Sequence, residues 1–273
     1  MNLSFEGVSF RYPNGVQALQ KVDLEIRAGE QVAWIGANGA GKSTLARLTN
    51  GLLRPVQGRV LVGDWDTRAH AVSDLARRVG YVFQNPDEQL FARSLREEVG
   101  FGPRNLGLSP ADIDAAVREA LAALDLSESA EANPYDLSPA RRKELGLAAI
   151  LAMRPPILIL DEPTTGQDAR GLARLGRVLG RARARGQTTI TITHDMDFCS
   201  EHAQRVVVFS EGQILTEGPA HEVFARRDLL DRAQVEPPQL VRLAEGLRLP
   251  DHPLNVDQFL ESWRAAMGDE VTR

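Results

Sequence analysis

Apolar and polar residues alternate over the first part of the chain, as they do in half-buried β-strands. Asn14-Gly15 is a turn signal between two of these stretches. The buried run at residues 31–35 precedes a glycine-rich loop, and two later runs repeat the strand pattern. We therefore expect strands at residues 3–5, 8–10, 22–26, 31–35, 59–62 and 79–83.

A helical spacing replaces this alternation after residue 83. Ser109 followed by Pro110 predicts a helix start, and an apolar stripe follows it at Ile113, Val117, Leu121 and Leu124. A second helix is expected from about residue 139 to 152. A third carries Leu172, Leu175, Val178 and Leu179 and should end near Gly186.

Strands return between and after these helices. Residues 157–160 are apolar at every position, which is typical of a central parallel strand covered on both faces. Residues 188–193 are rich in β-branched side chains, and 205–209 with 213–216 predict a hairpin around Glu211-Gly212. Strands that alternate with helices predict an α/β fold with a mainly parallel sheet. The tail from Pro219 is expected to be helical.

Composition narrows the class of protein. The chain has 273 residues, a net charge of −5 and an isoelectric point of about 5.6, which argues against nucleic acid as the main partner. No apolar run approaches about 18 residues, and the first residues lack the pattern of a signal peptide. The single cysteine, Cys199, suits a reducing compartment. We expect a cytosolic protein whose membrane role, if any, comes through a partner.

The stretch Gly36-Ala-Asn-Gly-Ala-Gly-Lys-Ser-Thr44 carries the strongest chemical signal. It has the spacing of a phosphate-binding loop, and it lies between a predicted strand and a predicted helix, as that motif requires. Its backbone N–H groups are expected to cradle phosphate oxygens at a helix N-terminus. Lys42 would reach the outer phosphates, and the Ser43 hydroxyl would bind Mg²⁺. The alternative, a chance glycine-rich turn, does not explain the strand and helix on either side.

Lysine is scarce in this sequence. Lysine and arginine together number 32, yet only Lys21, Lys42 and Lys143 are lysines. A chain that otherwise uses arginine is expected to keep lysine where a compact ammonium fits and a planar guanidinium does not.

Asp161-Glu162-Pro163 follows the apolar strand at 157–160 directly. An acid at the carboxyl end of a parallel strand lies where open α/β sheets bind ligands. Asp161 is the expected Mg²⁺ carboxylate, and Glu162 is placed to polarise a water for attack on a γ-phosphate. Such a pair before a proline is also common at an ordinary helix start; the phosphate loop upstream favours the catalytic interpretation.

Three further residues are weaker candidates. His194 follows the strand at 188–193 and is expected at the same sheet edge, where an imidazole can bond a γ-phosphate oxygen. Gln84 follows the strand at 79–83 and can touch Mg²⁺ or orient water, although its position alone decides nothing. Tyr12 can stack on a nucleobase, but a surface tyrosine in a turn is the ordinary alternative.

Together these residues resemble the ATP-binding cassette (ABC) ATPases of membrane transporters over roughly residues 1–220. Tyr12 stands at the aromatic A-loop, Gly36–Thr44 at Walker A, Gln84 at the Q-loop, Asp161 and Glu162 at Walker B, Asp168 in the D-loop and His194 at the switch histidine. The resemblance implies a phosphate-loop NTPase core with an N-terminal antiparallel β-subdomain and an α-helical subdomain. It implies ATP and Mg²⁺ as ligands, bound by the residues gathered here: for ATP, Tyr12, Asn38, Gly39, Ala40, Gly41, Lys42, Ser43 and Thr44; for Mg²⁺, Ser43, Gln84 and Asp161.

A finer resemblance concerns the ATPase subunits of energy-coupling factor (ECF) transporters, which import vitamins and cobalt or nickel ions. Gln84-Asn-Pro-Asp-Glu-Gln-Leu-Phe91 and the tail runs 217–224 and 236–243 carry it. It implies a domain at 1–230 whose helical subdomain, about 86–152, receives a coupling helix, and a C-terminal extension at 231–273. The role of residues 251–273 stays open: Phe259 and Trp263 are expected to pack on the core, and the alternative is that they face a partner. The implied partners are a second ATPase subunit, a transmembrane coupling subunit and a membrane substrate-binding subunit, at the cytoplasmic face of the membrane. Which solute is carried is not encoded in such a subunit.

One segment departs from the family pattern. The signature Leu-Ser-Gly-Gly-Gln reads Leu137-Ser-Pro-Ala-Arg141 here, and Gln167 replaces the usual leucine of the D-loop. By resemblance Ser138, Ala140, Arg141 and Asp168 act in trans on the nucleotide of the opposite subunit. Pro139 lacks an N–H and Ala140 adds a Cβ, so we expect this half-site to be weak, while the charge of Arg141 can compensate in part. The hypothesis is a heterodimer with one stronger hydrolytic site; a homodimer stays open.

Two other classes of ATP- or GTP-binding protein are alternatives. A soluble ABC-type ATPase acting on nucleic acid or ribosomes usually has coiled-coil insertions or two cassettes, and the sequence has neither a heptad run nor a duplicated motif. A phosphate-loop kinase or GTPase is disfavoured because Asp161-Glu162 with a downstream histidine suits hydrolysis better.

Overall fold

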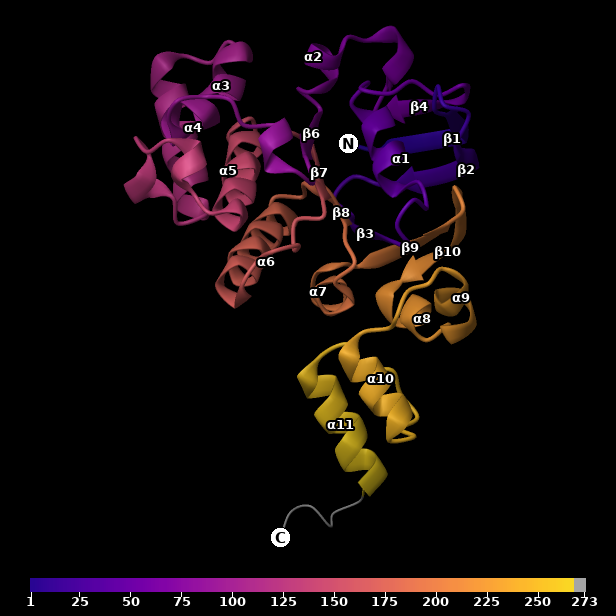
Figure 1. The fold of residues 1–273 in the computed structure, drawn as a ribbon. Helices are drawn as coiled ribbons and strands as arrows, with labels where there is room; N and C mark the ends of the chain where they lie inside the picture. Colours follow the sequence, from indigo (N-terminus) through magenta and orange to yellow (C-terminus); the bar gives the residue numbers. More distant parts are fainter. Residues whose placement is uncertain (268–273) are drawn as a thin grey trace.

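The computed structural model describes residues 1–267, and Figure 1 shows their arrangement. Strands gather in the upper right and centre of the view, and a group of helices, α3 to α5, stands to one side. The last two helices, α10 and α11, extend at the bottom.

The N-terminal sheet is antiparallel and has four strands in the order β2-β1-β4-β5. Polar residues alternate with buried ones along β2, where Val22, Leu24 and Ile26 point inward. The strands are β1 (Leu3–Arg11), β2 (Gln17–Ile26), β4 (Gln57–Val62) and β5 (Trp65–Asp66).

The second sheet has six strands in the order β10-β9-β3-β8-β7-β6. Its strands pair in parallel except for β10, which closes an antiparallel hairpin with β9. The strands are β3 (Gln31–Ile35), β6 (Val79–Val82), β7 (Ile157–Asp161), β8 (Thr188–Ile192), β9 (Arg205–Ser210) and β10 (Gln213–Pro219).

The helices cover these sheets and connect their strands. Ser94, Ser109, Ser138 and Asp168 each cap a helix N-terminus through a side-chain oxygen. The helices are α1 (Lys42–Thr49), α2 (Val72–Leu75), α3 (Leu95–Asn105), α4 (Pro110–Ala123), α5 (Pro139–Ala152), α6 (Ala169–Ala184), α7 (Met196–His202), α8 (Ala220–Phe224), α9 (Arg227–Arg232), α10 (Gln239–Gly246) and α11 (Val256–Met267).

Alternate residues of the central strands enter different hydrophobic clusters. In β7, Ile157 and Ile159 face the cluster shared with the N-terminal sheet, whereas Leu158 and Leu160 face α3 to α6. In β3, Trp34 joins the first cluster, and Ile35 joins a third cluster with α7 to α10. Both faces of the sheet are covered, which explains the uninterrupted apolar runs in the sequence.

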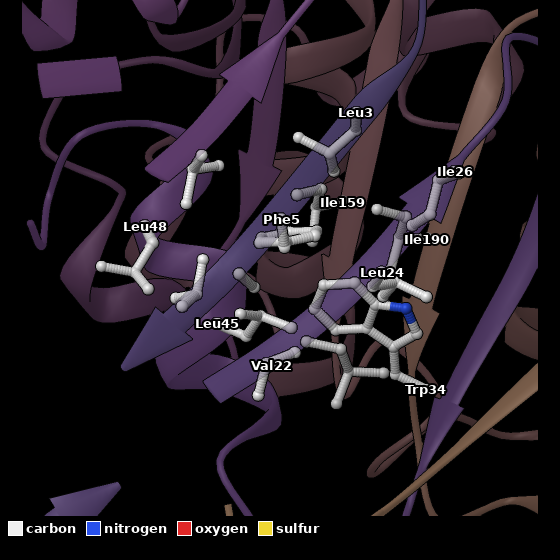
Figure 2. Packing of buried hydrophobic residues seen from close by; sticks show 14 of the residues in the cluster. Leu3, Phe5, Val22, Leu24, Ile26, Trp34, Leu45, Leu48, Ile159 and Ile190 are labelled. Carbon is white, nitrogen blue, oxygen red and sulfur yellow. The ribbon is translucent and has the colours of Figure 1, made fainter. Parts of the chain in front are cut away.

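The cluster between the two sheets is built around Trp34, which is fully buried (Figure 2). Its ring centroid lies 6.0 Å from that of Phe5 and 5.4 Å from that of Phe209. Leu45 and Leu48 of α1 pack into the same cluster, so the helix after the phosphate loop is held between the sheets. Removing a side chain as large as Trp34 would cost about 3–5 kcal/mol of stability.

Two glycines allow the phosphate loop to approach neighbouring backbone. A Cβ on Gly36 (φ +138°) would lie 2.2 Å from the carbonyl oxygen of Phe209 in β9. A Cβ on Gly41 (φ +103°) would lie 2.6 Å from the carbonyl oxygen of Ala18 in β2. The loop is therefore fixed against both sheets by contacts that only glycine permits.

Most predicted elements are confirmed, including the helix over 139–152 and the strand that leads into Asp161. The expected strands at 3–5 and 8–10 form one continuous strand, β1, with bulges where its register shifts. The sequence pattern gave no separate prediction for α3, which begins at the Ser94 cap. None of the helices among residues 1–267 is long and apolar enough to cross a membrane.

Candidate functional site

Four parallel strands deliver the candidate residues to one edge of the sheet. The phosphate loop follows β3, Asp161 ends β7, and His194 comes two residues after β8. Gln84 comes two residues after β6. Because these strands are adjacent and parallel, their carboxyl ends lie at one edge of the sheet. Side-chain contacts there join Ser43 with Asp161 and Glu162 with His194, whereas Gln84 is exposed after the end of β6.

The phosphate loop has the geometry of an anion cradle. Gly36, Gly39 and Gly41 all have positive φ, and α1 begins at Lys42. Lys42 Nζ donates hydrogen bonds to the carbonyl oxygens of Gly36 (2.6 Å) and Ala37 (2.9 Å). Burial lowers the pKa of this ammonium, against the opposing charges of Glu162 and Asp161. A phosphate that displaced the two carbonyls would give Lys42 a stronger, charged partner.

Asp161 is joined to the phosphate loop. The Ser43 hydroxyl donates to Asp161 Oδ1 at 3.0 Å, so a carboxylate and a hydroxyl oxygen lie side by side. Tyr81 of β6 donates to Asp161 Oδ2 at 2.6 Å, and burial raises the pKa of this phenol. Oxygen donors of this kind fit Mg²⁺.

Glu162 is buried at the sheet edge. Its Oε1 lies 3.1 Å from His194 Nε2, and its Oε2 accepts a hydrogen bond from the Thr165 hydroxyl at 3.3 Å. Burial raises the pKa of the Glu162 carboxyl, and nearby His194 acts in the opposite direction. A carboxylate with a raised pKa beside a phosphate loop is suited to accept a proton.

Tyr12 lies beside the phosphate loop. Its hydroxyl and the Thr44 hydroxyl share a hydrogen bond at 2.9 Å, and its ring packs edge-on against Phe10. The ring is half-buried, which leaves part of it free beside the loop.

The variant signature segment forms the start of α5. Ser138 is the N-cap and accepts a hydrogen bond from the Arg141 N–H at 3.4 Å. The Arg141 guanidinium turns back into its own subdomain, where it bonds the carbonyl oxygen of Leu124 and the carboxylate of Glu144. Arg174 of α6 also bonds Glu144, at 2.8 Å. Arg141 thus has an intrachain role, and its predicted action in trans stays a prediction.

The D-loop residues lie beside this segment. Asp168 caps α6 by accepting the Gly171 N–H at 2.7 Å, and it is exposed. Gln167 Nε2 donates to the carbonyl oxygen of Ala140 at 3.2 Å, which links the D-loop to the first turn of α5.

Several contacts of the site were not predicted. The hydrogen bond from Tyr81 to Asp161 and the bond between the Thr164 and Thr193 hydroxyls (2.7 Å) join neighbouring strand ends. These contacts depend on the order of the strands in the sheet, and the polarity pattern of a single strand does not reveal which strands are its neighbours. Lys143 donates to the carbonyl oxygens of Glu162 and Thr165, and the scarcity of lysine was its one signal in the sequence.

Comparison with known proteins places these features in a family. Residues 19–165 match the sequence pattern described as ABC transporter. The chain is 43% identical over 272 residues to the cobalt import ATP-binding protein CbiO of Rhodobacter capsulatus, covering 98% of this chain and 96% of that one. It is 44% identical over 272 residues to the energy-coupling factor transporter ATP-binding protein EcfA1 of Symbiobacterium thermophilum, covering 94% of each.

Some relatives are longer than this chain. A solved structure of one relative has the same fold. The chain spans only 40% of a putative ABC transporter ATP-binding protein of Methanosarcina acetivorans, at 42% identity over 89% of this chain. The structure of cbiO1 from Clostridium perfringens, part of the cbiONQ transporter complex, superposes with a TM-score of 0.75 at 32% identity, over 90% of this chain and 98% of that one. The chain belongs to the ABC transporter family, among the energy-coupling factor ATPases, and it binds and hydrolyses ATP.

Proposed function

We propose that this chain is the ATP-hydrolysing subunit of an ECF-type importer for a vitamin or a transition-metal ion. The observation that carries the proposal is the convergence at one sheet edge of Lys42, the Ser43–Asp161 pair and the Glu162–His194 pair. The names of the relatives CbiO and EcfA1 support the proposal that ATP hydrolysis drives an importer.

The phosphate loop and Lys42 would bind the triphosphate, with the half-buried ring of Tyr12 against the adenine. Ser43 and Asp161 would hold Mg²⁺, with Gln84 as a further ligand. Bound there, the ion would neutralise charge on the phosphate oxygens.

Glu162 would act as the general base that accepts a proton from the attacking water. Burial already favours proton uptake by its carboxyl group, and Thr165 holds one carboxylate oxygen. His194 Nε2, 3.1 Å from the other oxygen, would bond the γ-phosphate and keep Glu162 oriented.

Two variants test these roles. Glu162→Gln should keep ATP binding and lower turnover by about 10²–10⁴-fold, because the proton acceptor is gone. Lys42→Ala should abolish ATP binding, as measured by titration with a fluorescent ATP analogue. Turnover retained by Glu162→Gln would refute the assignment of Glu162.

We propose further that ATP binding closes two ATPase subunits and that hydrolysis reopens them. Ser138, Ala140, Arg141 and Asp168 would meet the nucleotide of the opposite subunit. Pro139 offers no N–H there, so a heterodimer whose partner brings a complete signature is favoured over a homodimer.

The heterodimer is tested with the isolated full-length chain. Slow, non-cooperative hydrolysis that rises when the partner subunit is added would support it. Robust cooperative turnover by the isolated chain, abolished by Glu162→Gln, would overturn it.

The membrane side of the machine would meet the helices after Gln84. Phe91 and Phe101 are 60% and 43% exposed and pack edge-on against each other, which leaves an apolar patch suited to a coupling helix. The subunit would then lie at the cytoplasmic face of the membrane, as a domain at 1–230 with an extension at 231–273, of which 268–273 lie outside the described residues. Co-purification distinguishes the alternatives: a membrane partner supports transport, and bound nucleic acid overturns it.

A further inference from the structure

Lys143 lies in the second turn of α5, five residues after the Ser138 cap, and reaches across to the loop that follows β7. Its Nζ donates hydrogen bonds to the carbonyl oxygens of Glu162 at 3.1 Å and of Thr165 at 3.0 Å. Two carbonyls that converge on one point suit a compact ammonium better than a planar guanidinium. In a sequence with 32 lysines and arginines, only three are lysines.

The surroundings of Lys143 are partly desolvated. The side chain is half-buried, and burial lowers the pKa of its ammonium while the carboxylates of Glu162 and Asp161 act in the opposite direction. A buried ammonium is costly unless it is paired and hydrogen-bonded, so the two carbonyl bonds are required for this placement.

Glu162 needs this support because its backbone is in the left-handed region. Its φ is +51°, a conformation that a non-glycine residue keeps only where the surrounding structure fixes it. Its N–H donates to the carbonyl oxygen of Ile192 in β8 at 2.8 Å. Its carbonyl oxygen accepts from Lys143. Lys143 therefore supplies one of the two bonds that hold the Glu162 peptide groups.

The orientation of the Glu162 carboxylate follows from this backbone conformation. With the peptide so held, Oε1 lies 3.1 Å from His194 Nε2 and Oε2 lies 3.3 Å from the Thr165 hydroxyl. Lys143 also bonds the Thr165 carbonyl oxygen, so one ammonium fixes both Glu162 and the residue that donates to its carboxylate.

A second hydrogen bond joins α5 to the loop that follows β7, and here the donor lies on the loop and the acceptor on the helix. Gln167 Nε2 donates to the carbonyl oxygen of Ala140 at 3.2 Å, one turn before Lys143 on α5. Gly171 leaves room for the Gln167 side chain, since a Cβ there would lie 2.2 Å from Gln167 Oε1. The base of α5 and the loop 162–167 are thus tied at both ends.

We propose that Lys143 is a positioning residue for hydrolysis: it holds the left-handed backbone of Glu162 so that the carboxylate faces the γ-phosphate. This inference rests on the proposed role of Glu162 as the base. Both hydrogen bonds described for the Lys143 ammonium go to the loop that follows β7 and not to the phosphate loop, so the expected effect is on turnover and not on nucleotide affinity.

The first test is Lys143→Met in the ATP-hydrolysing assembly purified with its partner subunits. We expect kcat to fall about 10- to 100-fold, the loss typical of a misplaced catalytic group, with the Kd for a fluorescent ATP analogue changed by less than about twofold. Lys21→Met is the matched control, because Lys21 is an exposed lysine of β2, a strand of the other sheet from the one that carries Glu162; it should leave kcat unchanged. Unchanged kcat in Lys143→Met would overturn the proposal.

A chemical rescue separates positioning from simple loss of stability. Lys143→Cys can be alkylated with 2-bromoethylamine, which restores an ammonium at the end of a side chain of lysine length. The native Cys199 is 2% exposed, and burial raises the pKa of its thiol, so it is protected from alkylation. Aminoethylation should recover most of kcat, and alkylation with iodoacetamide, which adds a neutral group, should not. Failure of aminoethylation to recover more than iodoacetamide would overturn the proposal.

A double variant distinguishes this inference from the proposed role of Glu162. If Lys143 acts through Glu162, Lys143→Met should lower kcat no further in a Glu162→Gln background. Full additivity would refute the inference alone. Turnover retained by Glu162→Gln by itself would instead refute the proposed function of Glu162.

Discussion

At the scale of single residues, Asp161 is held by a partner on each carboxylate oxygen. Ser43 donates to Oδ1, and Tyr81, buried in β6, donates to Oδ2 at 2.6 Å. The carboxylate cannot rotate without breaking one of these bonds. The proposed ligand for Mg²⁺ is thereby already oriented by the protein's own hydrogen bonds.

Tyr81→Phe should destabilise the protein by about 1.5–3 kcal/mol, because it removes a buried hydrogen bond to a charged group. Urea unfolding measures the change. Tyr135→Phe serves as the control: Tyr135 is 54% exposed and donates to a backbone carbonyl, so the loss should be about 0.5 kcal/mol. Equal effects in the two variants would contradict the importance of the Asp161 contact.

At the scale of elements, α7 packs on α6 through a histidine. The ring of His202 lies against Gly176, where a Cβ would come within 2.9 Å of it, and against Phe198 at 4.4 Å between ring centroids. Burial lowers the pKa of His202, with Glu201 acting in the opposite direction. The folded state therefore favours the neutral ring.

A group with a lowered pKa stabilises the fold above its ordinary pKa, near 6.5, and this contribution is lost as the pH falls through the lowered value. The free energy of unfolding should therefore drop more between pH 7.5 and pH 5.5 in the wild type than in His202→Gln. Urea unfolding at several pH values tests this. His221→Gln, at an exposed histidine of α8, should follow the wild type.

The start of α5 also yields a test, because Arg141 anchors a buried carboxylate. The double change Pro139→Gly and Ala140→Gly restores the family glycines and keeps the bonds from Arg141 to Glu144 and Leu124. Adding Arg141→Gln should cost about 1–3 kcal/mol, since Glu144 is buried and loses one of its two arginines.

Hydrolysis separates the two effects. If the present segment is a weak signature, the double variant should turn over ATP faster than the wild type, and the triple variant should be faster but less stable. Unchanged turnover in both variants would mean that the present segment is already competent.

What the sequence could predict differs between elements. The strand at 157–160 and the helix at 139–152 could be predicted from local patterns, because apolar residues mark the buried positions of each element. The common sheet edge of Glu162 and His194 could be predicted because both follow strands, but the 3.1 Å contact between them was not predicted. Lys143 and Tyr81 could not be assigned a role in this way, because their contacts depend on side-chain reach between elements distant in the sequence.

At the scale of the whole molecule, the nucleotide edge and the aromatic patch belong to adjoining regions. The chain segment from Gln84 to Phe91 leads from the end of β6 to the exposed patch of Phe91 and Phe101. A partner seated on this patch would contact the segment that carries a proposed Mg²⁺ ligand. The segment from Gln84 to Phe91 would thus connect the docking surface directly to the site of hydrolysis.

Phe91→Ser combined with Phe101→Ser should reduce the amount of membrane partner that co-purifies, because the apolar contact is lost. Affinity for a fluorescent ATP analogue should change by less than about twofold. Val72→Ser, at an exposed apolar residue of α2, provides the comparison and should retain the partner. Equal recovery of the partner with all three proteins would exclude the patch as a docking surface.

The position of β3 in its sheet has a consequence for how the protein is made. This strand leads into the phosphate loop, yet its two neighbours, β8 and β9, lie in the last third of the chain. At a synthesis rate of about 5–20 residues per second, β3 waits on the order of ten seconds for its partners. Until then its backbone edges are open to pairing with other chains. The phosphate loop is therefore synthesised early, but the strand that leads into it is paired late. A nascent chain arrested before β8 would lack this pairing.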